Sequence, residues 1–321
     1  MLTYSVPLRA RFRGLTFREG MVWRGAVGWG EFAPFADYTE AEAVPWLRAA
    51  VEAADVGWPQ SVRDSVPVNC TVPAVDPDAA QELVRAGHGC RTAKVKVGEP
   101  GQSLDEDIAR VEAVRDAIGP AGHVRVDANG AWDVDQAIRA VRMLDRAAGG
   151  LEYVEQPCAS VEELAELRRR IDVPVAADES IRRAPDPYRV RELDAADVAV
   201  LKVAPLGGVR ACLEIAERIG LPVVVSSALE TSVGLAAGVA LAAALPERPY
   251  ACGLGTATLL SRDLTAEPLL PVDGSLPVRA VSPSPAELDA ARADPETQRR
   301  WERRLAAVRA LAERTRQDRS T

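Results

Sequence analysis

Short apolar runs alternate with longer amphipathic segments through most of the sequence. The runs are rich in β-branched residues and end at Gly, Pro, Asn or Asp, which is typical of buried β-strands. The predicted strands are Val66–Val72, Thr92–Val97, Val124–Ala128, Tyr153–Gln156, Val173–Ala177, Val198–Val203, Pro222–Ser226 and Tyr250–Gly253. The predicted helices between them include Ser103–Ile118, Asp133–Ala148, Val161–Arg170, Val209–Ile219 and Thr231–Leu245. Eight strands that alternate with helices favour an α/β fold with a (β/α) barrel over an open sheet.

The first part of the chain has a different pattern. A three-stranded meander is predicted from Leu2–Phe12, Leu15–Trp23 and Ala26–Glu31, followed by an amphipathic helix at Glu40–Ala54. We therefore predict an α+β capping domain over residues 1–67 and a catalytic barrel over residues 68–261.

The end of the chain is charged, and Pro285–Arg316 is predicted to be helical. Two interpretations remain open for residues 262–321. Part of this segment packs back on the N-terminal unit, or it is a solvated helix with a frayed tail.

Composition narrows the classes of function. The net charge is −8 and there is no long basic block, so we expect no nucleic-acid partner. No apolar run is long enough to span a bilayer, so we expect no membrane partner. The five cysteines form no CxxC pair, which favours a reduced, cytoplasmic protein without a structural zinc. The oligomeric state stays open.

Charged residues stand at or near the carboxyl ends of five successive predicted strands. They are Lys94, Lys96, Asp127, Glu155, Asp178 and Lys202. In a barrel these strand ends meet at one rim, so we expect the side chains to face one another. Taken singly, each acid could be a helix N-cap and each lysine a snorkelling residue. Their occurrence on successive strands favours a site for a hard cation, Mg²⁺ or Mn²⁺, with room for substrate oxygens.

Lys-x-Lys followed by Asp, Glu, Asp and Lys on successive strands resembles the enolase superfamily in its muconate-lactonising subgroup. The resemblance covers nearly the whole chain. It extends to the stretches Arg13–Leu15, Gly28–Phe35, Val68–Asn69 and Gly253–Thr256, which are similar to one branch of that subgroup. It implies a modified TIM barrel with a capping N-terminal domain.

The resemblance also implies a role for each position. The metal ligands would be Asp127, Glu155 and Asp178, and the residues that orient them would be Asn129, Gln156 and Glu179. Lys96 would remove a proton α to a carboxylate. Lys94 would support the substrate carboxylate and lower the proton affinity of Lys96, and Lys202 would lie on the opposite face of the substrate. The substrate pocket would be lined by Asn69, Ser226, Ser227 and Gly253.

Three functions are compatible with these residues. The first is dehydration of a cyclic carboxylate, and the second is racemisation of an N-acylated amino acid with Lys96 and Lys202 as the two bases. The third is a metal-binding scaffold without catalysis, which the costly set of buried charges argues against. The partner would be a small-molecule carboxylate, and Arg11, Arg13 and Arg18 are candidates for contacting its distal carboxylate.

Overall fold

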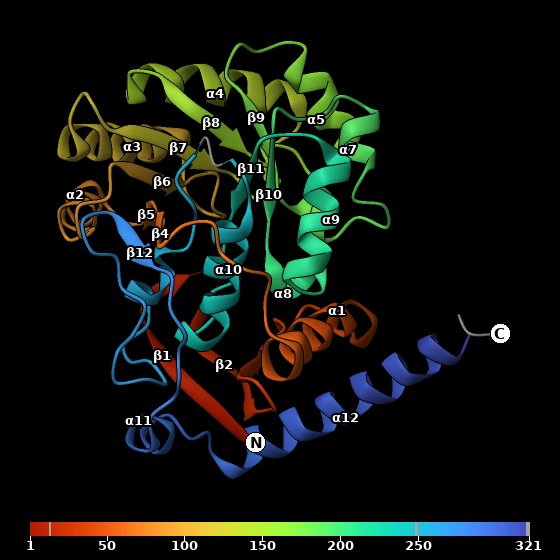
Figure 1. Ribbon diagram of the computed structural model, residues 1–321. Coiled ribbons are helices and arrows are strands. Elements are labelled where there is room, and N and C mark those ends of the chain that lie inside the picture. The colour runs from red at the N-terminus through yellow and green to blue at the C-terminus, as the bar shows by residue number, and fades with distance from the viewer. Residues whose placement is uncertain (13, 248–249, 319–321) are drawn as a thin grey trace.

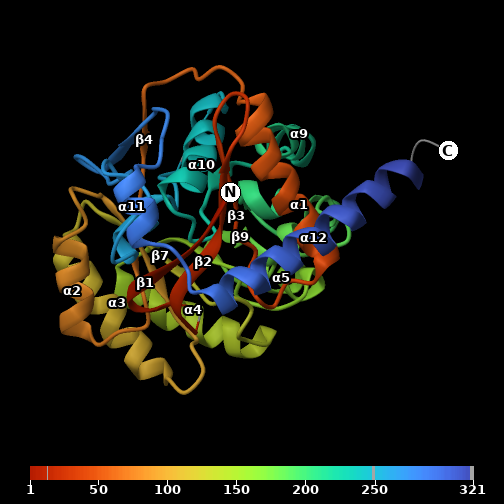
Figure 2. The same ribbon diagram turned by 90° about the horizontal axis from the view of Figure 1, so that it is seen from below.

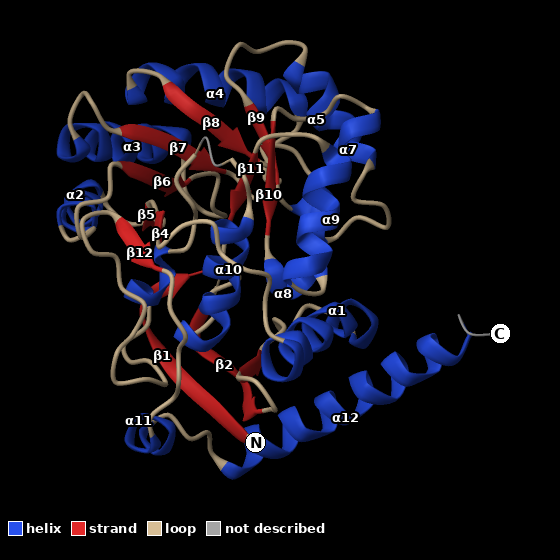
Figure 3. Cartoon of the chain, in the orientation of Figure 1, coloured by secondary structure: helices blue, strands red, loops and turns tan. Residues whose placement is uncertain are grey.

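The core of the molecule is a curled parallel sheet surrounded by helices (Figures 1 and 3). This computed structural model describes residues 1–12, 14–247 and 250–318. The sheet has seven strands in the order β11-β10-β9-β8-β7-β6-β5. They are β5 (Cys70–Val72), β6 (Thr92–Lys96), β7 (His123–Asp127), β8 (Leu151–Glu155), β9 (Val175–Ala177), β10 (Val198–Leu201) and β11 (Val223–Val225).

Single bridges close this sheet into a barrel. Ser226, just after β11, bridges Gly253, and Cys252 bridges Val68, just before β5. The prediction of a modified TIM barrel is therefore confirmed, but that of a regular eighth strand at Tyr250–Gly253 is wrong. The segment pairs with each of its two neighbours through a single bridge, which is too few for a regular strand ladder.

Helices cover the outer face of the barrel (Figure 3). They are α2 (Pro77–Arg85), α3 (Leu104–Ile118), α4 (Val134–Ala148), α5 (Val161–Arg168), α7 (Arg189–Glu192), α9 (Val209–Ile219) and α10 (Ser232–Ala244). Two short helices, α6 (Glu179–Arg182) and α8 (Val203–Leu206), lie instead at the carboxyl ends of β9 and β10. The starts of α3 and α4 are set by capping boxes at Ser103 and Asp133. These two residues were predicted as helical, but each lies outside its helix because its side chain caps the first turn.

The N-terminal unit packs against one end of the barrel. It consists of the antiparallel strands β1 (Leu2–Phe12), β2 (Leu15–Arg24) and β3 (Trp29–Phe32), the helix α1 (Glu40–Val51) and the π-helix η1 (Glu52–Val56). The predicted strand Val66–Val72 is in fact two elements. Its first half, β4 (Ser65–Pro67), pairs with β12 (Ser275–Pro277) outside the barrel, and only β5 joins the parallel sheet. The connection after Gly253 contains the 3₁₀-helix η2 (Gly255–Leu259). The division into domains at residues 67 and 261 stays a prediction.

The C-terminal segment crosses the N-terminal unit, and its last part projects beyond the body (Figures 1 and 2). It forms α11 (Pro285–Ala290) and α12 (Pro295–Asp318), so the single helix predicted at Pro285–Arg316 is wrong. The break has a local cause: Asp294 caps α12 through the amides of Glu296 and Thr297, and a residue before proline avoids helical geometry. Trp301 of α12 packs edge-on against Phe32, with ring centroids 6.1 Å apart.

Two glutamates of the N-terminal unit cap helices of the barrel. Glu52 accepts a hydrogen bond from the amide of Val209, the first residue of α9, at 2.5 Å. Glu31 of β3 accepts from the amides of Thr231 and Gly234 at the start of α10, at 3.2 and 2.9 Å. Helix N-termini carry unpaired amides and a partial positive charge, so each contact stabilises the docking of the two units. No helix in the described ranges is long and apolar enough to cross a membrane.

Glu31 is expected to make stability depend on pH. Burial raises its pKa from the ordinary 4.5 to about 7, although hydrogen bonds from Thr231 and Tyr4 and the charge of Arg18 oppose the shift, while Glu230 adds to it. Between pH 4.5 and 7 the folded protein therefore binds a proton at Glu31 that the unfolded chain does not. Its contribution to stability is complete below pH 4.5 and is lost as the pH rises to 7, with a slope of at most about 1.4 kcal/mol per pH unit. Urea unfolding of the wild type and Glu31→Gln across this range measures it, and identical slopes in the two proteins would contradict it.

Candidate active site

The charged residues lie side by side because the strand register aligns them. Lys96 pairs with Asp127 across β6 and β7, and Asp127 pairs with Glu155 across β7 and β8. Asp178 and Lys202 directly follow β9 and β10. Paired residues of parallel strands point to the same face, so these side chains gather inside the carboxyl end of the barrel.

The lysines and carboxylates are in direct contact. Lys94 Nζ lies 2.6 Å from Glu155 Oε1 and 2.8 Å from Asp127 Oδ2. Lys96 Nζ lies 2.6 Å from the same Asp127 oxygen, and Lys202 Nζ lies 2.7 Å from Asp178 Oδ2. All six side chains are buried. Burial of so many charges is costly unless each is paired, and here each has a partner.

Burial and neighbouring charges move the pKa values in opposite directions. Burial alone disfavours ionised Asp127, but the ammonium groups of Lys94 and Lys96 hold its pKa well below the ordinary value. Burial also disfavours ionised Asp178, but the charges of Arg182 and Lys202 hold its pKa below the ordinary value. Burial and the charge of Asp127 raise the pKa of Glu155 to about 7. Burial opposes charged Lys94 too, but Asp127 and Glu155 raise its pKa well above the ordinary value.

The positions of the lysines in the sequence point to this site. The sequence has 39 basic residues, and the only three lysines among them are Lys94, Lys96 and Lys202. Arginine stays charged in proteins, whereas lysine can lose its proton. Lysine therefore occurs only where the chain faces this cavity, which is a signal available in the sequence.

The residues predicted to orient the metal ligands lie around them. Asn129 accepts from Lys96 Nζ at 2.5 Å and donates to Glu179 Oε1 at 3.1 Å. Gln156 Oε1 accepts from the amide of Asp178 at 3.0 Å. Asn129 therefore contacts Lys96, Gln156 contacts Asp178, and Glu179 contacts Asn129.

Arg182 was missed by the sequence reasoning. Its Nε donates to Asp178 Oδ1 at 2.8 Å, its Nη2 donates to Glu179 Oε1 at 2.5 Å, and its Nη1 donates to the hydroxyl of Tyr38 in the N-terminal unit. The sequence signal was its spacing of four residues from Asp178, which places the two side chains on one helical face.

The donor set fits a hard divalent cation. Asp127, Glu155 and Asp178 offer carboxylate oxygens, and within the described part of the chain Glu155 Oε2 and Glu179 Oε2 are buried without a hydrogen-bond partner. In this conformation the ammonium groups lie among the carboxylates. Accordingly, no group of three His, Cys, Asp or Glu residues in the described ranges is gathered as a preformed metal cluster.

A small cavity opens onto the lysines. It is lined by Phe12, Phe35, Thr71, Lys94, Lys96, Asp127, Asn129, Lys202, Ser226, Ser227, Ala228, Leu229, Gly253 and Thr256. Three of the four predicted substrate-lining residues, Ser226, Ser227 and Gly253, are among them. The cavity is small, about 30 Å³. Phe12 and Phe35 of the N-terminal unit form part of the cavity wall. Neither was predicted from the sequence to line the substrate pocket.

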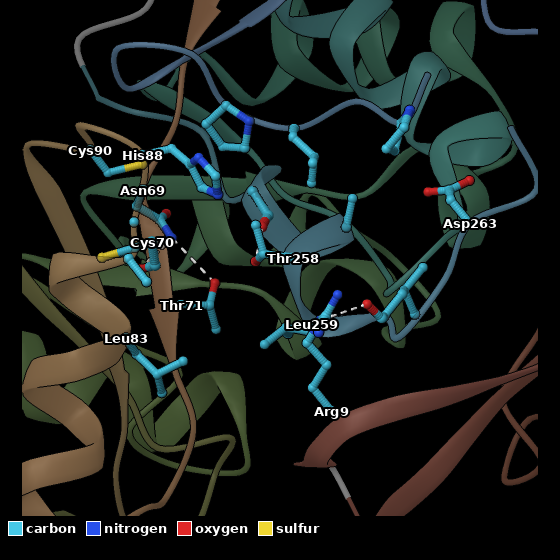
Figure 4. Close-up of a pocket in the computed structure, with 18 of the residues that line it drawn as sticks. Arg9, Asn69, Cys70, Thr71, Leu83, His88, Cys90, Thr258, Leu259 and Asp263 are labelled. Carbon is cyan, nitrogen blue, oxygen red and sulfur yellow. Dashed lines mark hydrogen bonds between the residues drawn. The ribbon is translucent and has the colours of Figure 1, made fainter. Parts of the chain in front are cut away.

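The fourth predicted residue, Asn69, lines a different cavity of about 430 Å³ beside α2 and η2, together with the thiols of Cys70 and Cys90 (Figure 4). That cavity shares Thr71 with the first one but has none of the lysines or of their carboxylate partners. It is therefore not the centre of the chemistry.

The three arginines proposed for the distal carboxylate differ in position. Arg11 is exposed and lies with Phe12 and Lys96 along a groove outside the cavity. Arg13 lies outside the described residues. Arg18 is buried and donates to backbone carbonyls behind the cavity wall. Of the two that the structure describes, Arg11 and Arg18, Arg11 is the exposed one and shares its groove with Lys96.

Comparison with known proteins agrees with this geometry. Residues 77–283 match the family described as Enolase C-terminal domain-like, and residues 3–54 match Enolase N-terminal domain-like. The chain is 65% identical over 310 residues to the o-succinylbenzoate synthase of Thermobifida fusca, covering 97% of this chain and 96% of the relative. It is 57% identical to that of Mycolicibacterium smegmatis, covering 92% and 91%.

Solved structures share the fold. A muconate lactonizing enzyme from Pseudomonas fluorescens superposes with a TM-score of 0.78 at 23% identity, covering 91% of this chain and 97% of that one. An N-succinyl Arg/Lys racemase from Bacillus cereus superposes with a TM-score of 0.77 at 19% identity, covering 91% and 96%.

The fold, the site and the matched families define an enzyme of the enolase superfamily, whose members depend on a divalent metal ion. Within this superfamily the chain belongs to the o-succinylbenzoate synthase family. The family resemblance read from the sequence is thus confirmed.

Proposed function

We propose that this enzyme eliminates water from 2-succinyl-6-hydroxy-2,4-cyclohexadiene-1-carboxylate to give 2-succinylbenzoate, a step of menaquinone biosynthesis. The observation that carries this proposal is the 65% identity to an o-succinylbenzoate synthase over 97% of the chain. The five free cysteines support a cytoplasmic location.

Charge balance supports a carboxylate substrate. Three lysines face three carboxylates, namely Asp127, Glu155 and Asp178. A divalent cation, for which we propose Mg²⁺ with Mn²⁺ as a substitute, would be held by these carboxylates. With Lys96 neutral, as a base must be, one positive charge is left uncompensated. The ring carboxylate of the substrate restores neutrality, which favours its binding in a buried site.

Lys96 is the proposed base. It removes the proton α to the ring carboxylate, and the bonding electrons move into that carboxylate to form an enediolate. The enediolate collapses, the carbon–oxygen bond of the ring hydroxyl breaks, and the oxygen leaves as water with the proton returned by Lys96. For this Lys96 must first give up its contact with Asp127 Oδ2, 2.6 Å away.

Other residues stabilise the developing charge. When bound, the divalent cation supplies positive charge beside the carboxylate oxygens, as is established for enolase-superfamily sites. Lys94 is proposed to support the substrate carboxylate, and Lys202 to act as a cation on the opposite face. Asn129 donates through its backbone amide to Asp127 Oδ1, Gln156 accepts from the amide of Asp178, and Glu179 accepts from Arg182. These three are proposed to orient the ligand residues.

The decisive experiment is a side-by-side assay of the purified protein with Mg²⁺. One arm follows aromatisation of the cyclohexadiene substrate, and the other follows racemisation of an N-succinylamino acid. Turnover of the first supports the proposal. Racemisation alone would replace it by the alternative that a structural neighbour, an N-succinyl Arg/Lys racemase, keeps open.

Lys202→Arg is expected to separate the two reactions. Arginine keeps the cation beside Asp178 but cannot act as a base, since guanidinium does not deprotonate in proteins. Dehydration should fall only by roughly 10²–10³-fold, the loss typical of a misplaced electrostatic group. Racemisation should be eliminated, because one enantiomer needs neutral Lys202. Rates of both reactions measured on one preparation check this, and equal residual fractions would contradict the electrostatic role.

A further inference from the structure

A single buried arginine of the N-terminal unit holds a loop of the barrel. Arg18 of β2 donates through Nε to the carbonyl of Leu229 at 2.9 Å and through Nη2 to that of Ala228 at 3.4 Å. The same Nη2 donates to the carbonyl of Ala33, and Nη1 to that of Glu19 at 3.1 Å. Only 2% of the residue is exposed. One guanidinium therefore ties β2, the segment after β3 and the loop after β11 together.

The loop needs such a restraint. Leu229 has φ +63°, a left-handed conformation that costs free energy for a residue with a side chain. Inside the loop, Ala228 N donates to Glu230 at 2.7 Å and Leu229 N to Ser227 Oγ at 3.2 Å. These bonds satisfy the amides but not the carbonyls of Ala228 and Leu229. Arg18 supplies the donors for both carbonyls.

The groups that Arg18 contacts form one wall of the lysine cavity. Its guanidinium lies 4.6 Å from the ring centroid of Phe35. Phe35, Ala228 and Leu229 all line the cavity, whereas Arg18 does not. Arg18 thus touches three lining residues from behind. The hydrogen bonds that the structure shows for Arg18 all go to backbone carbonyls, and none goes to Lys96 or to the carboxylates of the site.

We propose that Arg18 is a positioning residue that fixes the wall of Phe35, Ala228 and Leu229 and so determines how tightly the dicarboxylate substrate is held. The inference rests on the proposed function for the identity of the substrate. Because Lys96 and the metal-binding carboxylates lie outside its contacts, Arg18 acts on binding far more than on the proton transfer.

The test compares Arg18→Met with a matched control, Arg63→Met. Arg63 also donates to several carbonyls of the α10 region, but to those of Ala242, Leu245 and Pro246 at its other end, at 2.8, 2.5 and 3.0 Å. Four quantities are measured for each protein. They are amide hydrogen exchange of residues 226–231, the KM and kcat for the cyclohexadiene substrate, and the thermal midpoint.

In Arg18→Met we expect exchange at residues 226–231 and KM each to rise by about 10-fold or more, as follows from losing hydrogen bonds to buried carbonyls. The kcat should change by less than about threefold, since uniform binding is what is lost. Arg63→Met should lower the thermal midpoint without changing loop exchange or KM. Arg18→Lys, which keeps the charge but cannot span the carbonyls, should lie between wild type and Arg18→Met, and it provides the test if Arg18→Met does not fold.

Two outcomes would overturn the inference: unchanged loop exchange in the Arg18 variants, or an equal rise of KM in Arg63→Met. The exchange measurement needs no substrate. A wild type inactive on the cyclohexadiene substrate would therefore refute the proposed function, while loop exchange still decides whether Arg18 anchors the wall.

Discussion

Replacing Lys96 with alanine is expected to lower turnover by roughly 10²–10⁴-fold, the contribution typical of a general base. The fold should persist, because Asp127 keeps its contact with Lys94 at 2.8 Å after the Lys96 amine is lost. NMR in D₂O measures the effect directly, since solvent deuterium should no longer appear at the α-carbon of the N-succinylamino acid enantiomer whose α-proton faces Lys96. Circular dichroism and Mn²⁺ titration should give results close to those of the wild type.

A control for the charge of Lys96 comes from arginine. All three lysines of the chain face the same cavity, so no lysine elsewhere can serve as a comparison. Lys96→Arg keeps a cation beside Asp127 but removes the base, since guanidinium stays protonated. It should be as inactive in exchange as Lys96→Ala. Deuterium incorporation at the wild-type rate in either variant would place the base on another residue.

Asp178→Asn is expected to weaken Mg²⁺ binding by more than about 100-fold, the upper range for residues that only orient ligands. The carboxylate is an anionic ligand of a hard cation in the proposed site, and the amide that replaces it is neutral. The change also removes a buried negative charge that lies 2.7 Å from Lys202 and 2.8 Å from Arg182. Stability should therefore fall by about 3 kcal/mol. Calorimetric Mg²⁺ titration and urea unfolding measure the two effects.

Asp197→Asn is the matched control. Asp197 pairs with Arg168 at 2.8 Å and accepts from the amide of Val175, but it precedes β10 and so lies at the opposite end of the barrel. This variant removes an Asp–Arg pair without touching the candidate metal site, so Mg²⁺ affinity should stay at the wild-type value. Unchanged Mg²⁺ affinity and turnover in Asp178→Asn would show that Asp178 is not a ligand.

Much of the candidate site could be predicted because its signals are local. The two-residue period of a strand places Lys94 and Lys96 on one face, and the end of each apolar run marks where Asp127 and Glu155 leave the sheet. Features that depend on distant partners were not predictable. Phe35 reaches the cavity only because β3 docks on the barrel, and Tyr38 meets Arg182 across 144 residues of sequence.

By itself the sequence determined the parallel barrel, the capping unit and the residues that carry charge to one rim, because these follow from periodicity and strand ends. The tertiary structure decided how the barrel closes, through single bridges at Cys252 and Gly253, and where the C-terminal helix breaks. It also decided that Arg18 serves a loop more than 200 residues away. Such contacts depend on the shapes of two packed surfaces, and no local pattern in either segment encodes them.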